Sequence, residues 1–266
     1  MRVAVSWMAR AAEQGPARAE PLAALAQRAA AAGAELLVLP EFGALPFAGD
    51  VASLPAEPSD GPLAHRLAAI ARAHRIALVA GYLEACSGRL YSAALAITAE
   101  GVAIANYRRT HLATDERETL AAGAWLSLVP VGGRKAGLLI GYDLRFPEVA
   151  RALVLEGADF LAVLGGPSRE PASTVEPLLR ARAIENGVPV AHAAWEQRDG
   201  AGAALFGPDG RGLARAERPG ELACAELPAA DPERAGLAQR RKRLYQGLVA
   251  GLGPHASLGD GQGSGA

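Results

Sequence analysis

Short apolar runs alternate with amphipathic segments along most of this chain, and the two periodicities predict strands and helices in turn. We expect strands at residues 3–7, 35–39, 76–82, 90–97, 102–107, 134–140, 160–164 and 188–193, and helices at 17–32, 62–74, 147–156 and 173–186. A turn at Glu100-Gly101 joins two of these strands, and the turn at residues 207–210 predicts a further hairpin. Alternating strands and helices with added hairpins are typical of an α/β fold in which helices cover stacked sheets.

The length of the chain suits one such domain. It has 266 residues, half of them apolar, which is enough to bury a full core. We expect a single domain over residues 1–250. The remaining residues, 251–266, are rich in glycine and predict a flexible C-terminal tail.

Charge and cysteine content exclude several classes of partner. Lysine and arginine number 27 against 28 acidic residues, so nothing at this scale attracts the chain to nucleic acid or an anionic membrane. No apolar run approaches the roughly 20 residues that span a bilayer. Cys86 and Cys224 are too few for a disulfide framework or a thiolate metal site. The first residues do not read as a secretory signal, and both features favour a cytoplasmic protein. Metal-binding motifs and phosphate loops are missing, so we expect a small-molecule or protein partner and no metal or cofactor.

The segment 135–148, KAGLLIGYDLRFPE, carries the strongest signal for a reactive site. It runs from a buried strand into a sharp bend and then into the start of a helix. In α/β enzymes such a bend can hold a nucleophile above the sheet, beside backbone N–H groups that stabilise an oxyanion. The residue at this bend is Gly141, which has no side chain. The scaffold of a reactive site is therefore predicted without its reactive atom.

Other candidate residues are less specific. Glu41 directly follows the apolar run LLVLP, at the end of a strand where ligands tend to bind, and burial there would raise its pKa. The same glutamate would equally suit a loop cap or a structural ion pair. His111 lies in a charged loop without a placed nucleophile, so we expect it to order that loop. Arg182 and Glu185 are three apart on a helix that ends near Asn186-Gly187, which by itself is an ordinary helix end.

Taken together, the motifs LLVLPEF, NYRRTHL, GLLIGYDLRFPE, GADFLAVL and RARAIEN resemble the carbon–nitrogen hydrolase family of nitrilases and amidases. The resemblance covers about residues 1 to 250. It implies a four-layer α-β-β-α sandwich that assembles as dimers or larger oligomers. It further implies hydrolysis of amides, nitriles or carbamoyl groups without metal or cofactor, through a glutamate base, a lysine and a cysteine nucleophile.

Two of the positions that carry this chemistry differ here. The resemblance places the family's base on Glu41 and its second glutamate on Glu116, whereas its lysine falls on Arg109 and its cysteine on Gly141. Glycine cannot form a thiolate, and arginine keeps its proton, so it cannot shuttle one. We predict that Arg109 forms a charged cluster with both acids, with room for a water or ligand atom where the cysteine side chain is missing.

These replacements lead to two main hypotheses for function. The first is a catalytically silent protein that binds an amide-like or carboxylate ligand, or serves as a partner subunit. In the second, Glu41 activates a water while Arg109 and the backbone N–H of Tyr142 polarise a carbonyl. An engineered inactive variant, or a site completed by another chain, is also compatible with the sequence. Substrate choice is expected to lie in the loops 42–50 and 167–174.

Overall fold

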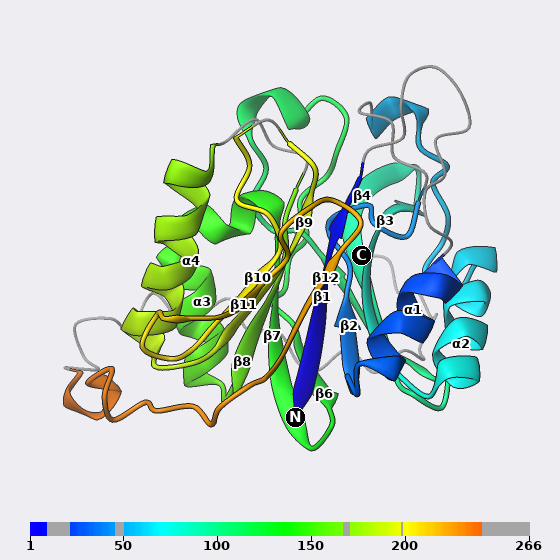
Figure 1. Ribbon diagram of the computed structural model, residues 1–266. Helices are drawn as coiled ribbons and strands as arrows, with labels where there is room; N and C mark the ends of the chain where they lie inside the picture. The colour runs from blue at the N-terminus through cyan, green and yellow to red at the C-terminus, as the bar shows by residue number, and fades with distance from the viewer. Residues whose placement is uncertain (10–21, 46–50, 167–170, 198, 241–266) are drawn as a thin grey trace.

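The computed structural model describes residues 1–9, 22–45, 51–166, 171–197 and 199–240 (Figure 1). Its strands are β1 (Arg2–Met8), β2 (Leu36–Val38), β3 (Ala77–Cys86), β4 (Arg89–Ile97), β5 (Ala103–Arg108), β6 (Leu128–Val131), β7 (Arg134–Ile140), β8 (Phe160–Leu164), β9 (Val190–Trp195), β10 (Ala204–Phe206), β11 (Gly212–Arg215) and β12 (Leu222–Glu226). The α-helices are α1 (Leu22–Ala31), α2 (Pro62–His74), α3 (Pro147–Leu155) and α4 (Ala172–Asn186). Short 3₁₀ turns are η1 (Val51–Ser53), η2 (Thr114–Glu116), η3 (Gly141–Arg145) and η4 (Leu237–Gln239).

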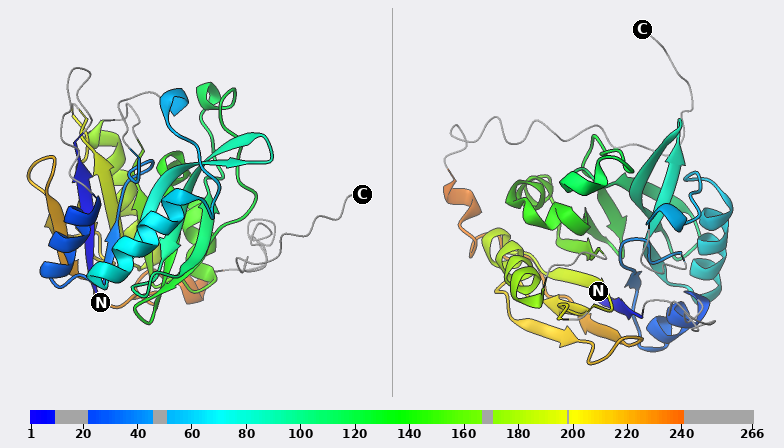
Figure 2. Two further views of the ribbon diagram at one scale, coloured as in Figure 1. Left: turned by 90° about the vertical axis from the view of Figure 1, so that its right-hand side faces the viewer. Right: turned by 90° about the horizontal axis from the view of Figure 1, so that it is seen from above.

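The strands follow the order β5-β4-β3-β2-β1-β9-β8-β7-β6 and fold back as two facing halves, with α1 and α2 outside one half and α3 and α4 outside the other (Figures 1 and 2). Strand β1 joins the halves. Its first part pairs in parallel with β2, and its last residues, Trp7 and Met8, pair in parallel with the end of β9. The expected α-β-β-α sandwich is confirmed.

Side-chain alternation along the strands explains the four layers. In β1, Val3 and Val5 point into the apolar cluster between the two halves, whereas Ala4 points toward α1 and α2. In β7, Leu138 lies in that same central cluster, and Leu139 packs toward α3 and α4. Because successive residues of a strand face opposite sides, a strand that is apolar throughout can be buried on both faces. This two-sided burial explains why these strands are near-continuous apolar runs in the sequence.

The expected helices and strands are present, with adjusted ends. The strand expected at 76–82 continues to Cys86, since β3 pairs along its whole length with β4. Strand β6 was not expected, because it is short, contains Pro130 and lies at the edge of the sheet beside β7, where proline is tolerated. Residues 17–21 of the first expected helix and the whole expected tail, 251–266, lie outside the described residues.

Within the described ranges, no helix has the length and apolar character needed to cross a membrane.

A strand glycine offers a test of how closely α3 packs on the sheet. A Cβ on Gly137 of β7 would lie 3.0 Å from Cβ of Leu153 on α3 and 3.0 Å from a methyl carbon of Leu161. We expect Gly137→Ala to lower the free energy of unfolding by about 1–3 kcal/mol through overpacking, measured by urea denaturation. Gly212→Ala is the matched control, because nothing lies within 4 Å of its added carbon. That control should be neutral or stabilising by roughly 0.5 kcal/mol, and equal effects of both changes would contradict the packing argument.

Candidate active site

The bend after β7 is held by a single buried carboxyl group. Gly141 has φ +47°, in the left-handed region that glycine adopts without strain, and the chain then turns through η3 into α3. The Asp143 side chain has no exposed surface and accepts hydrogen bonds from the Tyr107 hydroxyl at 2.7 Å and from the backbone N–H groups of His111 and Ile140 at 3.0 and 3.1 Å. The acid two residues after the bend therefore fixes its shape.

Helix α4 supports the same bend from the other side. The buried guanidinium of Arg182 donates to the carbonyl oxygen of Leu144 at 2.9 Å and to that of Arg145 at 3.3 Å. It also forms an ion pair with Glu185, at 2.9 Å. These bonds satisfy carbonyl groups of η3 that would otherwise be buried without partners.

His111 contacts the bend as well, although we expected it only to order its own charged loop. Its ring stacks on Phe146 with centroids 3.9 Å apart, and its Nδ1 lies 3.0 Å from the Asp143 carboxyl. These contacts order the segment between β5 and η2.

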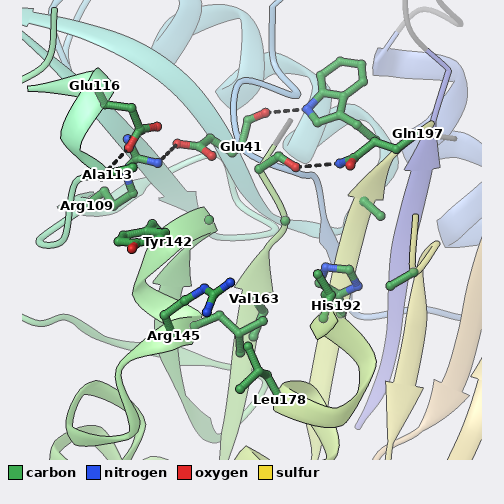
Figure 3. Close-up of a pocket in the computed structure, with 18 of the residues that line it drawn as sticks. Glu41, Arg109, Ala113, Glu116, Tyr142, Arg145, Val163, Leu178, His192 and Gln197 are labelled. Atoms are coloured by element: carbon green, nitrogen blue, oxygen red, sulfur yellow. Dashed lines mark hydrogen bonds and ion pairs between the residues drawn. The ribbon is translucent and has the colours of Figure 1, made fainter. Parts of the chain in front are cut away.

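The predicted charged cluster is present above the bend. Arg109, just after β5, lies 3.0 Å from the Glu41 carboxyl and 2.7 Å from that of Glu116 in η2 (Figure 3). The Ser92 hydroxyl on β4 donates to the same oxygen of Glu41 that Arg109 contacts. Glu41 and Arg109 are only 1% and 2% exposed, so this is an interior ion pair that bridges three separate segments.

Two hydrogen bonds hold the backbone of Glu41 in place. Its carbonyl oxygen accepts a hydrogen bond of 2.6 Å from the indole N–H of Trp195, and its N–H donates to the carbonyl of Gly165 at 3.1 Å. Trp195 ends β9 and Gly165 follows β8, so the facing half of the sandwich positions this residue. The carboxyl is thereby directed toward the bend.

Burial decides the protonation of this pair. Loss of solvent raises the pKa of the Glu41 carboxyl above its usual 4.5, although Arg109 and the Ser92 hydroxyl oppose the shift. Burial also lowers the pKa of Arg109, but Glu41 and Glu116 outweigh it and the net shift is upward. Arg109 is therefore a permanent cation beside an acid that is unusually ready to hold a proton.

The space at Gly141 differs from the expectation. A Cβ on this residue would lie 2.5 Å from Oε2 of Glu41 and 3.2 Å from a nitrogen of Arg109. The predicted room for a water or ligand atom in place of the missing side chain is therefore wrong, because the Glu41 carboxyl takes that place. A side chain at position 141 would require this carboxyl to rotate away.

A cavity of about 520 Å³ opens over the cluster. All of the predicted site residues line it, namely Glu41, Arg109, Glu116, Gly141 and Tyr142. Cys86 and Cys224 are not among its described lining residues, and the described part of the chain contains no group of acids, histidines and cysteines arranged to hold a metal ion. Residues 46–50 and 167–170 of the loops expected to set specificity lie outside the described residues.

Sequence reasoning missed several polar residues of the same cavity. Arg145, His192, Trp195 and Gln197 also line it, and Gln197 donates to the carbonyl of Gly166 at 3.0 Å (Figure 3). Arg145 lies within the bend motif, so its position could have been inferred. His192 gave one weak signal, as a polar residue inside the apolar strand run VAHAAW.

The comparisons with known proteins agree with this fold. A model of the carbon-nitrogen hydrolase family matches residues 2–235, and the chain therefore belongs to that family. It is similar to an amidase from Nesterenkonia sp. AN1, with a TM-score of 0.75 and 28% identity, covering 92% of this chain and 98% of the amidase. Structures of variants of that amidase show addition of acrylamide at its active-site cysteine and, in a variant with a cysteine changed to alanine, a complex with butyramide.

Two relatives known by sequence carry hydrolase names. The chain is 40% identical over 168 residues to the hydrolase in the pqqF 5' region of Pseudomonas protegens, covering 61% of this chain and 59% of that protein. It is 30% identical over 247 residues to the chloroplastic omega-amidase of Arabidopsis thaliana, covering 83% of this chain and 67% of the relative. The match to the first relative thus spans less than two thirds of its length.

The hydrogen bonds at the bend predict that the free energy of unfolding depends strongly on Asp143. Asp143→Ala leaves the Tyr107 hydroxyl and two backbone N–H groups without their acceptor, and we expect it to lower the free energy of unfolding by about 3 kcal/mol or more. Tyr107→Phe removes only one of these bonds and should cost roughly 1.5 kcal/mol. Chemical denaturation followed by circular dichroism measures both. Similar losses for the two variants would show that Asp143 does not organise the bend.

The raised pKa of Glu41 predicts that the stability of the folded protein depends on pH. Because its pKa is raised in the folded protein, the unfolded chain binds fewer protons above pH 4.5, and the folded state loses stability as pH rises through the folded pKa. Glu41→Gln cannot titrate, so its stability relative to the native chain should increase with pH from about 4.5 upward, measured by thermal unfolding.

Glu100→Gln provides a control of opposite sign. A hydrogen bond with the Thr98 side chain, together with one to its own backbone, lowers the pKa of this exposed carboxylate. Its removal should therefore reduce relative stability as pH rises toward 4.5. A pH-independent difference for Glu41→Gln would contradict the raised pKa.

Proposed function

We propose that this chain is a carbon–nitrogen hydrolase family protein that binds a small amide or carboxylate and lacks thiol-dependent hydrolysis. The observation that carries the proposal is the residue at the bend. The family resemblance assigns the nucleophile to Gly141, whose backbone is left-handed and whose missing side chain is replaced by the Glu41 carboxyl. No described cysteine lines the cavity to take its place.

The cost of losing a nucleophile supports a silent protein. Glycine can neither attack a carbonyl nor hold an acyl group, and removing the nucleophile of a protease such as subtilisin costs on the order of 10⁶ in turnover. Arg109 adds to the loss, because a guanidinium of raised pKa does not transfer protons. Its fixed charge and planar donors suit the binding of a carbonyl or carboxylate oxygen.

The ligand class follows from the cavity and the relatives. The cavity combines the Glu41 carboxyl, which can accept an amide N–H, with the Arg109 guanidinium. A variant of the related amidase with a cysteine changed to alanine forms a complex with butyramide, which supports a small amide here. We also propose that the protein acts in the cytoplasm as a homodimer or larger oligomer, as composition and family resemblance lead us to expect.

A second candidate function rests on the raised pKa of Glu41. In this alternative the protein hydrolyses an amide or other C–N bond through a water that Glu41 deprotonates, with Arg109 and the Tyr142 N–H stabilising the oxyanion. A base with a raised pKa accepts a proton more readily, and Arg109 remains a cation 3.0 Å from it.

Binding and turnover of butyramide separate the two functions. We expect butyramide to raise the melting temperature of the purified chain, since a ligand that prefers the folded state stabilises it, and we expect no ammonia release. The double variant Gly141→Cys with Arg109→Lys restores the family's residue types and serves as the comparison. Ammonia release by the native chain that disappears in Glu41→Gln would contradict the proposal and establish the water mechanism.

A further inference from the structure

His192 presents one defined hydrogen-bonding atom to the cavity. It lies on β9, is 3% exposed, and its Nδ1 is 3.0 Å from the carbonyl oxygen of Gly202. A carbonyl oxygen can only accept, so Nδ1 carries the hydrogen. In a neutral imidazole the other nitrogen, Nε2, is then an acceptor with a free lone pair.

Burial keeps the His192 ring neutral. Loss of solvent lowers the pKa of His192 to about 4, and the charge of Arg215 adds to the effect, while the bond to Gly202 opposes it. The ring is therefore neutral near pH 7. Among the described residues, Nε2 has no protein donor.

The backbone of Gly165 packs close to Nε2, and both residues line the cavity. A Cβ on Gly165 would lie 2.5 Å from Nε2, so any other residue would press against this atom. The close-up shows the His192 ring in the cavity wall across from Arg145, with Val163 between them (Figure 3). The ring thus contributes a hydrogen-bond acceptor to the cavity wall.

The next residue connects this acceptor to the charged cluster. A Cβ on Gly166 would lie 2.3 Å from Oε2 of Glu41. His192 and Glu41 therefore face neighbouring residues of one dipeptide, whose Cα atoms are about 3.8 Å apart. Both side chains also line the same cavity of about 520 Å³, so a ligand in this cavity can contact Glu41 and His192.

We propose that His192 is a specificity residue, whose Nε2 accepts a hydrogen bond from a donor group at the end of the ligand remote from its amide. The ligand class is a small amide with a second polar group, such as a hydroxyl. An apolar end at this place would bury the acceptor without a partner, which weakens binding. The inference rests on the proposed binding of a small amide.

Two probes of the same size test this inference. Butyramide and 3-hydroxypropionamide differ only in a terminal methyl group against a hydroxyl. We expect the native chain to bind the hydroxylated amide roughly tenfold more tightly in isothermal titration calorimetry, which is the effect of about one satisfied buried hydrogen bond.

Matched variants locate the preference on Nε2. His192→Asn places an amide N–H₂ where Nδ1 donates to Gly202 but has no acceptor at Nε2, and we expect it to lose the preference. His192→Gln can place an acceptor near the Nε2 position and should retain most of it. Circular dichroism confirms that each variant is folded.

Equal affinity of the native chain for both probes, or an unchanged preference in His192→Asn, would overturn the inference and leave the proposed function standing. Failure of the native chain to bind either probe would overturn both.

Discussion

The buried ion pair between Arg109 and Glu41 is the constraint on which the site depends. Removing two charges from water costs several kcal/mol per ion, and mutual attraction offsets this only where geometry and further hydrogen bonds are good. Ser92 and Glu116 supply these further contacts. Because the partners come from β4 and from segments that follow β2 and β5, the pair is satisfied only when that half of the sandwich is correctly aligned.

Glycines allow the rest of the site to approach this pair. Gly141, Gly165 and Gly166 each stand where a Cβ would come within 2.5 Å of a polar atom of Glu41 or His192. A cavity floor built from backbone leaves the carboxyl and imidazole open to a ligand. The same arrangement means that a side chain at position 141 would require the Glu41 carboxyl to move, so the glycine and the position of the glutamate are structurally linked.

The supports of the bend do not depend on a side chain at position 141. Asp143 and Arg182 hold η3 through buried hydrogen bonds, and none of these bonds involves the side chain at position 141. The fold can therefore carry a glycine there without losing the geometry of the cavity. A binding function needs only that geometry and its charges, whereas covalent hydrolysis needs a nucleophilic atom as well.

Strand and helix periodicity predicted the alternating elements and the bend at Gly141, because these are local properties of the chain, whereas the four-layer order and the partners of Arg109 were expected from the resemblance to the carbon–nitrogen hydrolase family. The sequence missed β6, whose pairing depends on β7, and it missed His192, which becomes a pocket residue only when β9 packs beside β8. It also predicted open space at Gly141. Only the tertiary structure decided that point, because the carboxyl that fills the space belongs to a residue one hundred positions earlier in the chain.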